Sequence, residues 1–227
     1  MTFSLVGRCA RTGMLGAVVT TSSISVGSRC SHARAGIGAA LTQHRTDPRL
    51  GPLALDLLAH GFSAPEAMQA LVAATPHRHW RQLALIDAAG RTAVYSGANV
   101  RAERGEAQGR DCAAIANIVR SASLPQAMVA AFEASPGQPL ARRLLDALAA
   151  GEAAGGEYQP VTSAALLVMD RESFPYVDLR VDDHAQPITE LARLWAKYEP
   201  EAHAYVIRAV DPEAAVPPPG MKLPPTL

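Results

Sequence analysis

The sequence has few cysteines, few aromatic residues and no excess of either charge. Aromatic side chains make up 5% of its 227 residues, and 21 basic residues balance 21 acidic ones. A chain without a basic excess is not expected to bind nucleic acid. Its three cysteines, Cys9, Cys30 and Cys112, are odd in number and lack CxxC spacing, which argues against both a disulfide framework and a zinc knuckle.

Long hydrophobic runs are also missing. No stretch approaches the ~18 apolar residues of a membrane span, and Arg8 interrupts the first apolar run, so neither a membrane segment nor a secretory signal is expected. Together with reduced cysteines, these absences predict a cytoplasmic protein without membrane contact. Alanine, in contrast, is abundant, which favours helices packed closely against a flat sheet.

Strand patterns and helix patterns occur in blocks rather than in strict alternation. The predicted elements, in chain order, are strands at 2–9, 16–23 and 35–43, helices at 46–60 and 62–74, a hairpin at 83–97, an apolar run at 112–119, helices at 124–135 and 138–156, strands at 162–170 and 176–183, and a helix at 187–198. Asp47 is the expected N-cap of the first helix. Ser63, with Glu66 at the capping-box position, is the expected N-cap of the second.

This order predicts an α+β fold with hairpins and helix pairs. Nearly continuous apolar strands indicate sheets that are covered on both faces, so we expect a four-layer αββα sandwich of antiparallel sheets, with 2–9 and 16–23 paired in an inner sheet. One domain should span 1–211, followed by a proline-rich, mobile tail at 212–227.

Several polar clusters have a simple structural interpretation. His77 and His79 form an HxH pair, but they lie in an expected loop without nearby ligands, so no metal site is predicted. The Asp182–His184 segment is interpreted as a connection between a strand and a helix. GEAAGGE at 151–157 is a helix end with glycine stops and lacks the lysine of a P-loop. Cys30 has a cationic neighbour that can activate a thiol, but packing as a small hydrophobic residue is favoured.

Thr2 is the strongest candidate for chemistry. If Met1 is removed, Thr2 carries both a hydroxyl and a free α-amine, and an amine of pKa ~7.7–8.0 suits a general base for that hydroxyl. The expected strand also begins at this residue. The alternative is an ordinary N-terminal strand with Met1 retained.

Five stretches carry a resemblance to a known family: MTFSLVGRCARTGMLGAVV, VGSRCSHARAGIGAALTQHRTDPRLG, ALIDAAGRTAVYSG, AAGGE and YVDLRVDDH. With these, the chain resembles the bacterial family called domain of unknown function 1028, whose members are classed as N-terminal nucleophile (Ntn) hydrolase-like. The resemblance implies the same αββα sandwich, and the family's activity is poorly defined.

The resemblance also implies roles for individual residues. Thr2 takes the nucleophile position, Arg29 or His32 supplies a basic group, Thr42 and Gln43 form the oxyanion segment, and Asn117 lies in a later loop of the site. The chain departs from the family pattern at two further positions: Ser22 replaces a longer or basic side chain, and Ala116 replaces a glycine.

The resulting hypothesis is a hydrolase that acts on a small-molecule amide without a cofactor or metal. Its expected catalytic residues are Thr2, Gln43 and Asn117, and its expected pocket residues are Ser22, Arg29, His32 and Thr42. The alternative is a non-catalytic small-molecule binding or assembly protein on the same fold. In either case a homo-oligomer, most simply a dimer, is expected.

Overall fold

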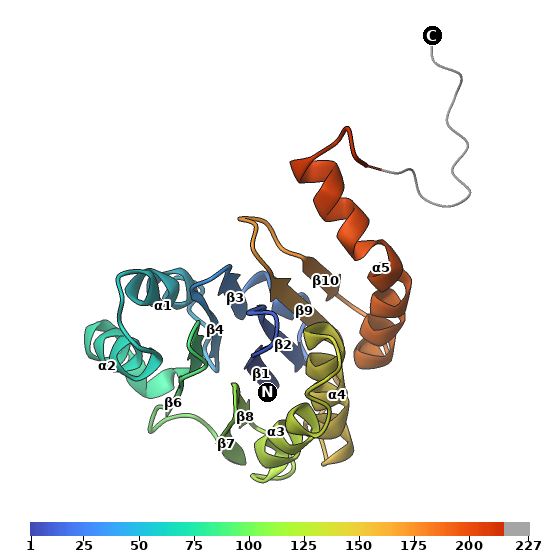
Figure 1. The fold of residues 1–227 in the computed structure, drawn as a ribbon. Helices are drawn as coiled ribbons and strands as arrows, with labels where there is room; N and C mark the ends of the chain where they lie inside the picture. The colour runs from blue at the N-terminus through green and yellow to red at the C-terminus, as the bar shows by residue number, and fades with distance from the viewer. Residues whose placement is uncertain (216–227) are drawn as a thin grey trace.

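Two antiparallel sheets form the centre of the molecule (Figure 1), as described for residues 1–215 by a computed structural model. The six-stranded sheet has the order β10-β9-β2-β1-β8-β7, and the four-stranded sheet has the order β3-β4-β5-β6. Their bounds are β1 (Thr2–Arg8), β2 (Leu15–Thr21), β3 (Ser31–Arg34), β4 (Gly38–Gln43), β5 (Gln82–Asp87), β6 (Thr92–Ser96), β7 (Arg104–Gly109), β8 (Cys112–Asn117), β9 (Ser163–Met169) and β10 (Val177–Val181). Most of the expected tail at 212–227 lies outside the described residues.

Helices cover the outer face of each sheet (Figure 1). The helices α1 (Leu50–Ala59) and α2 (Ala64–Ala74) pack on the four-stranded sheet, whereas α3 (Leu124–Ala134), α4 (Leu140–Ala153) and α5 (Pro187–Val210) pack on the six-stranded one. Two short 3-10 helices, η1 (Val26–Ser28) and η2 (Arg78–Trp80), lie in connections. The result is a helix–sheet–sheet–helix order of layers.

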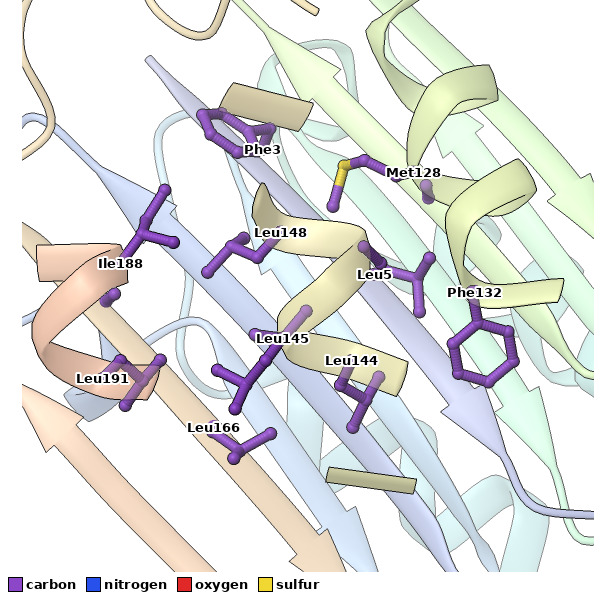
Figure 2. Packing of buried hydrophobic residues seen from close by; sticks show 14 of the residues in the cluster. Phe3, Leu5, Met128, Phe132, Leu144, Leu145, Leu148, Leu166, Ile188 and Leu191 are labelled. Atoms are coloured by element: carbon purple, nitrogen blue, oxygen red, sulfur yellow. The ribbon is translucent and has the colours of Figure 1, made fainter. Parts of the chain in front are cut away.

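The core is divided among the three interfaces between these layers. Figure 2 shows Phe3 and Leu5 of β1 packed among leucines of α4 and against Met128 and Phe132 of α3. Val6 of the same strand belongs instead to the cluster between the two sheets. Because side chains alternate along a strand, Thr2 and Ser4 share the face of Val6 and point toward the four-stranded sheet.

The structure confirms an α+β fold with two antiparallel sheets. The strands predicted at 2–9 and 16–23 are β1 and β2, and they pair in the middle of the six-stranded sheet, with Phe3 opposite Thr20. The capping box of α2 is also confirmed, since Ser63 and Glu66 exchange hydrogen bonds at its first turn.

Four local predictions were wrong. The edge strands β3 and β7 were missed, because β3 is short and β7 is largely polar, with one exposed face. The helix α1 begins at Leu50 with Arg49 as its N-cap, because Pro48 and Arg49 form a turn before it. Asp47 still accepts the Arg49 N–H and also binds its guanidinium. The helix α5 continues past Pro200 to Val210. Within residues 1–215, no helix has the length and apolarity needed to cross a membrane.

Candidate functional site

A cavity of ≈ 380 Å³ opens where β1 begins, between the ends of the two sheets. Its lining comes from the start of β1, the end of β2 and the residues after it, the turn after β4, the β6–β7 connection and the residue after β8. Segments far apart in the sequence therefore meet around the first residues of the chain. Loops held by a rigid sheet are a common place for binding and catalysis.

Thr2 reaches this cavity because it is the first inward-facing residue of a central strand. It lies opposite Asn117 of β8, and only 7% of it is exposed. Its hydroxyl is hydrogen-bonded to the carbonyl of Met1 and lies 3.4 Å from the hydroxyl of Thr21. The Thr21 hydroxyl in turn donates to the same Met1 carbonyl at 2.5 Å. Two hydroxyls thus converge on the peptide that joins Met1 to Thr2.

A buried carboxylate, Glu157, lies beside this group. One of its oxygens, Oε2, accepts a hydrogen bond from the Ser22 N–H at 3.0 Å, while Oε1 finds no partner among residues 1–215. Burial raises the pKa of Glu157 to about 7, and its hydrogen bond with Ser22 and the positive amino terminus partly oppose that rise. Glu157 therefore changes its charge near neutral pH.

The amino terminus responds to the same surroundings. Burial lowers the pKa of the terminal amine at Met1 below its usual value of 8.0, and the charge of Glu157 opposes the effect. The charge of each of these two groups therefore shifts the pKa of the other.

Glu157 was missed by the sequence analysis, which treated 151–157 only as a helix end. Gly155 and Gly156 adopt positive φ after α4, and an isolated bridge joins Glu157 to Val119. These features turn the chain back toward the cavity. The AAGGE motif was the available signal, because the end of a helix does not require an acidic residue after its glycine pair.

A network of buried amides ties the sheets together beneath the cavity. Ser4 Oγ donates to Gln43 Oε1 at 2.7 Å, and Gln43 Nε2 donates to Gln82 Oε1 at 2.7 Å. Asn117 Nδ2 also donates to Gln82 Oε1, at 3.0 Å, and Gln82 Nε2 donates to the Ala116 carbonyl at 3.0 Å. Because these residues come from β1, β4, β5 and β8, the network fixes the strand ends that carry Thr2.

The turn after β4 supplies one wall of the cavity. His44 and Arg45 both adopt positive φ there, and among residues 1–215 their backbone N–H groups donate no hydrogen bond. The Arg101 N–H donates to His44 Nε2 at 3.3 Å, so Nδ1 is the protonated nitrogen and donates to the Trp80 carbonyl at 2.9 Å. Burial lowers the pKa of His44 and keeps the ring neutral.

Two other groups of candidate residues lie outside the cavity. His77 and His79 are exposed, and residues 1–215 contain no group of three His, Cys, Asp or Glu side chains placed to hold a metal ion. Asp182 pairs with Arg180, and His184 Nδ1 accepts the Gln186 N–H just before α5. The second group is thus accounted for by local structure.

Comparison with known proteins gives a family but no activity. A family model described as "Family of unknown function (DUF1028)" matches residues 2–191. The chain belongs to the DUF1028 family. A solved DUF1028 protein, SPO2555 from Silicibacter pomeroyi, is 31% identical, with a TM-score of 0.80 over 87% of this chain and 88% of that one.

Other comparisons add little to the DUF1028 assignment. Anbu (ancestral beta-subunit) from Yersinia bercovieri aligns over 97% of this chain and 100% of that one, but 12% identity and a TM-score of 0.41 support no conclusion. No curated protein matches the chain.

In this DUF1028 protein, the residues implied by the resemblance fall into three places. Thr2, Ser22 and Arg29 line the cavity. Gln43 and Asn117 are buried beneath it. Thr42 is also buried, but it shares the face of Ala40 toward α1, where its hydroxyl donates to the Asp47 carbonyl at 3.4 Å.

His32 lies elsewhere in the DUF1028 fold. It is opposite Ala40, whose side chain packs toward α1 and α2, and its ring contacts Gly51 at the start of α1. The structure therefore does not bring His32 to the cavity, because its position in β3 turns it to the outer face of the sheet. Cys30 does line the cavity, and burial raises the pKa of its thiol, which disfavours the reactive thiolate.

Proposed function

We propose that this protein is an N-terminal-nucleophile amide hydrolase whose nucleophile is Thr2. The observation that carries the proposal is the position of Thr2: it is the first inward-facing residue of a central strand, in a cavity that also holds the amino end of the chain near buried Glu157. Removal of Met1 would place a free amine and a hydroxyl on the same residue. A hydroxyl needs such a base to become a nucleophile.

The proposed reaction has two stages. In the first, Thr2 Oγ1 bonds to the carbonyl carbon of the amide while the Thr2 amine takes the hydroxyl proton. The C–N bond then breaks, and the leaving amine takes that proton with it. In the second stage, water attacks the resulting ester and gives one proton back through the amine to Thr2 Oγ1. The products are a carboxylic acid and an amine, and the enzyme returns to its starting state.

The oxyanion of each stage requires hydrogen-bond donors. The backbone N–H groups of His44 and Arg45 are suited to this role, since they lie in the cavity lining and make no other hydrogen bond within residues 1–215. Such a donor is typically worth ~10²–10³ in rate. The Asn117 side chain is fully buried, does not line the cavity and bonds Gln82, so Asn117 would position Thr2 rather than hold the oxyanion.

Glu157 would set the protonation of the amine. After loss of Met1, the Thr2 amine would occupy the region where the present amino end and Glu157 influence each other. Burial of that region favours the neutral amine, which is the form that acts as a base. A carboxyl group that titrates near neutral pH can hold the displaced proton between steps.

The layered fold supports the same proposal. The resemblance to Ntn hydrolase-like proteins implies an αββα sandwich, and the two antiparallel sheets with outer helices have that arrangement. Because a fold alone does not determine a function, we place the weight on the cavity and on Thr2.

Three variants test the proposal against a panel of small amides. Thr2→Ala removes the hydroxyl but keeps the strand, so it should abolish hydrolysis, whereas Thr2→Ser should retain part of it. Thr12→Ala is the matched control, because Thr12 is exposed in the turn at the opposite end of the β1–β2 hairpin. Equal hydrolysis by wild type and Thr2→Ala would contradict the proposal. Ligand binding without hydrolysis by any form would favour a binding protein instead.

A further inference from the structure

The geometry points to an amide substrate that carries a carboxylate, held by Arg29, Arg45 and Arg101 at the wall of the cavity. This inference rests on the proposed hydrolase function and specifies its substrate class. The three arginines come from separate segments, namely the loop after β2, the turn after β4 and the β6–β7 connection, and all three line the same cavity. Together they form a cationic wall of the cavity, to which each segment contributes one arginine.

Within the described part of the chain, these arginines form no ion pair with a carboxylate. Within residues 1–215, the arginines that form ion pairs are others, such as Arg8 with Asp111 and Arg34 with Asp56. Glu157 is the acidic side chain next to the cavity residues, and it is bound to the Ser22 N–H and is largely buried. The charge of the cationic wall is therefore available to a ligand.

Arg29 is held in place before any ligand arrives. Its Nη1 donates to the carbonyls of Ile24 and Ser25 at 2.7 and 2.8 Å, and its Nη2 donates to Ser23 Oγ at 2.6 Å. These bonds use three of the five guanidinium N–H donors, which leaves two for a ligand. A guanidinium already fixed in position loses less side-chain entropy when it binds.

The other two arginines, Arg45 and Arg101, are each anchored by one contact. The Arg45 guanidinium lies 5.4 Å from the centre of the Trp80 ring, and the Arg101 backbone N–H is bonded to His44. Their side chains are exposed. Planar guanidinium groups bind carboxylates with paired, charge-assisted hydrogen bonds, and a cavity near the lower end of the usual ~300–1,000 Å³ range suits a small molecule.

A series of ligands with one carbon skeleton separates charge from shape. Succinamide is neutral, succinamate carries one carboxylate and succinate carries two, and calorimetry can measure their binding to Thr2→Ala protein, in which turnover cannot interfere. We expect succinamate to bind at least about tenfold more tightly than succinamide, which is the range of a charge-assisted contact. Added salt should reduce that preference.

Matched arginine variants locate the effect. The double variant Arg45→Gln/Arg101→Gln should lose the preference for succinamate, and it removes no side-chain hydrogen bond recorded within residues 1–215. Arg29→Gln should weaken it separately. Arg78→Gln is the control, because Arg78 is exposed in η2 and does not line the cavity. Unfolding midpoints within experimental error of the parent protein's show that the double variant is folded.

Failure of this inference can be distinguished from failure of the proposed function. Equal binding of succinamide and succinamate, no binding of succinamate at millimolar concentration, or an unchanged preference in the folded double variant would each overturn the inference. Thr2-dependent hydrolysis that is equally fast for neutral and anionic amides would also overturn it while the hydrolase function stands. Arginine-dependent binding of succinamate without hydrolysis of any amide would support the anion site and contradict the hydrolase.

Discussion

At the scale of single residues, burial shifts the pKa values of both Glu157 and the terminal amine beside the cavity. Glu157 is 4% exposed, and its pKa of about 7 lies well above the ordinary value of 4.5. Burial disfavours its charged form. The folded state thus binds this proton more tightly than the unfolded state does, and stability must depend on pH over that range.

Replacing Glu157 by glutamine should remove this dependence. The stabilisation from the neutral form is fully present below pH 4.5 and is lost as the pH rises through about 7. Urea unfolding measures the free energy of unfolding at pH 5 and at pH 8. Between these pH values wild type should lose more of it than Glu157→Gln does, by on the order of 1–3 kcal/mol. Equal losses in the two proteins would show that Glu157 does not titrate in this range.

The buried amide network should make Gln82 sensitive to substitution. Gln82→Leu removes one hydrogen bond each from the Gln43 amide, the Asn117 amide and the Ala116 carbonyl. Gln43 Nε2 then keeps only a contact of 3.5 Å with the Thr2 carbonyl. An unsatisfied buried group costs ~1–3 kcal/mol, so we expect chemical denaturation to show a loss of about 3 kcal/mol. Gln69→Leu is the control, since Gln69 is exposed on α2 and should change stability little. Similar effects of the two changes would contradict the role given to the network.

At the scale of elements, the caps of α2 and α3 offer a matched pair. The Ser63 side chain accepts the Glu66 N–H at the start of α2, whereas Ser123 occupies the N-cap of α3 without a side-chain cap bond. Ser63→Ala should lower the free energy of unfolding by about 1 kcal/mol, and Ser123→Ala should have a smaller effect. Thermal unfolding measures both, and a larger loss for Ser123→Ala would contradict this account.

The elements also show which features a sequence reveals. The buried strands β1, β2 and β9 were predicted because continuous apolar runs bounded by turns are distinctive. The edge strands β3 and β7 were missed because they are paired on one side only and need little apolar character. The start of α1 was misplaced because Pro48 and Arg49 form a turn between Asp47 and the helix, although Asp47 still accepts the Arg49 N–H and also binds the Arg49 side chain.

At the scale of the whole molecule, the cavity depends on contacts that no local pattern contains. Once β1 is assigned as a strand, the alternation of its side chains is enough to predict that Thr2 faces inward. Glu157, however, meets Ser22 across 135 positions of sequence, and Arg45 and Arg101 join Arg29 only when three loops meet. The sequence therefore singled out Thr2 as the candidate nucleophile, but it did not indicate Glu157 and the two arginines near it.

The assembly of the whole molecule stays a prediction. Closed symmetric dimers are the commonest oligomers, and Leu53 and Phe62, on or beside the outer helices α1 and α2, are each 43% exposed. We expect a dimer mass from light scattering at micromolar concentration, because burying these side chains is favourable. A monomer mass under those conditions would contradict the expectation.

The central claim is that Thr2 is the first residue and the nucleophile of the mature protein, and peptide mass analysis after treatment with a β-lactone tests it most directly. Attack by Thr2 Oγ1 on the lactone carbonyl opens the ring, and the ring oxygen takes the proton, so the adduct adds the full mass of the reagent. The account predicts an N-terminal peptide that begins at Thr2 and carries the adduct on that residue, with none in Thr2→Ala. A chain that retains Met1, or an adduct on another residue that persists in Thr2→Ala, would contradict it.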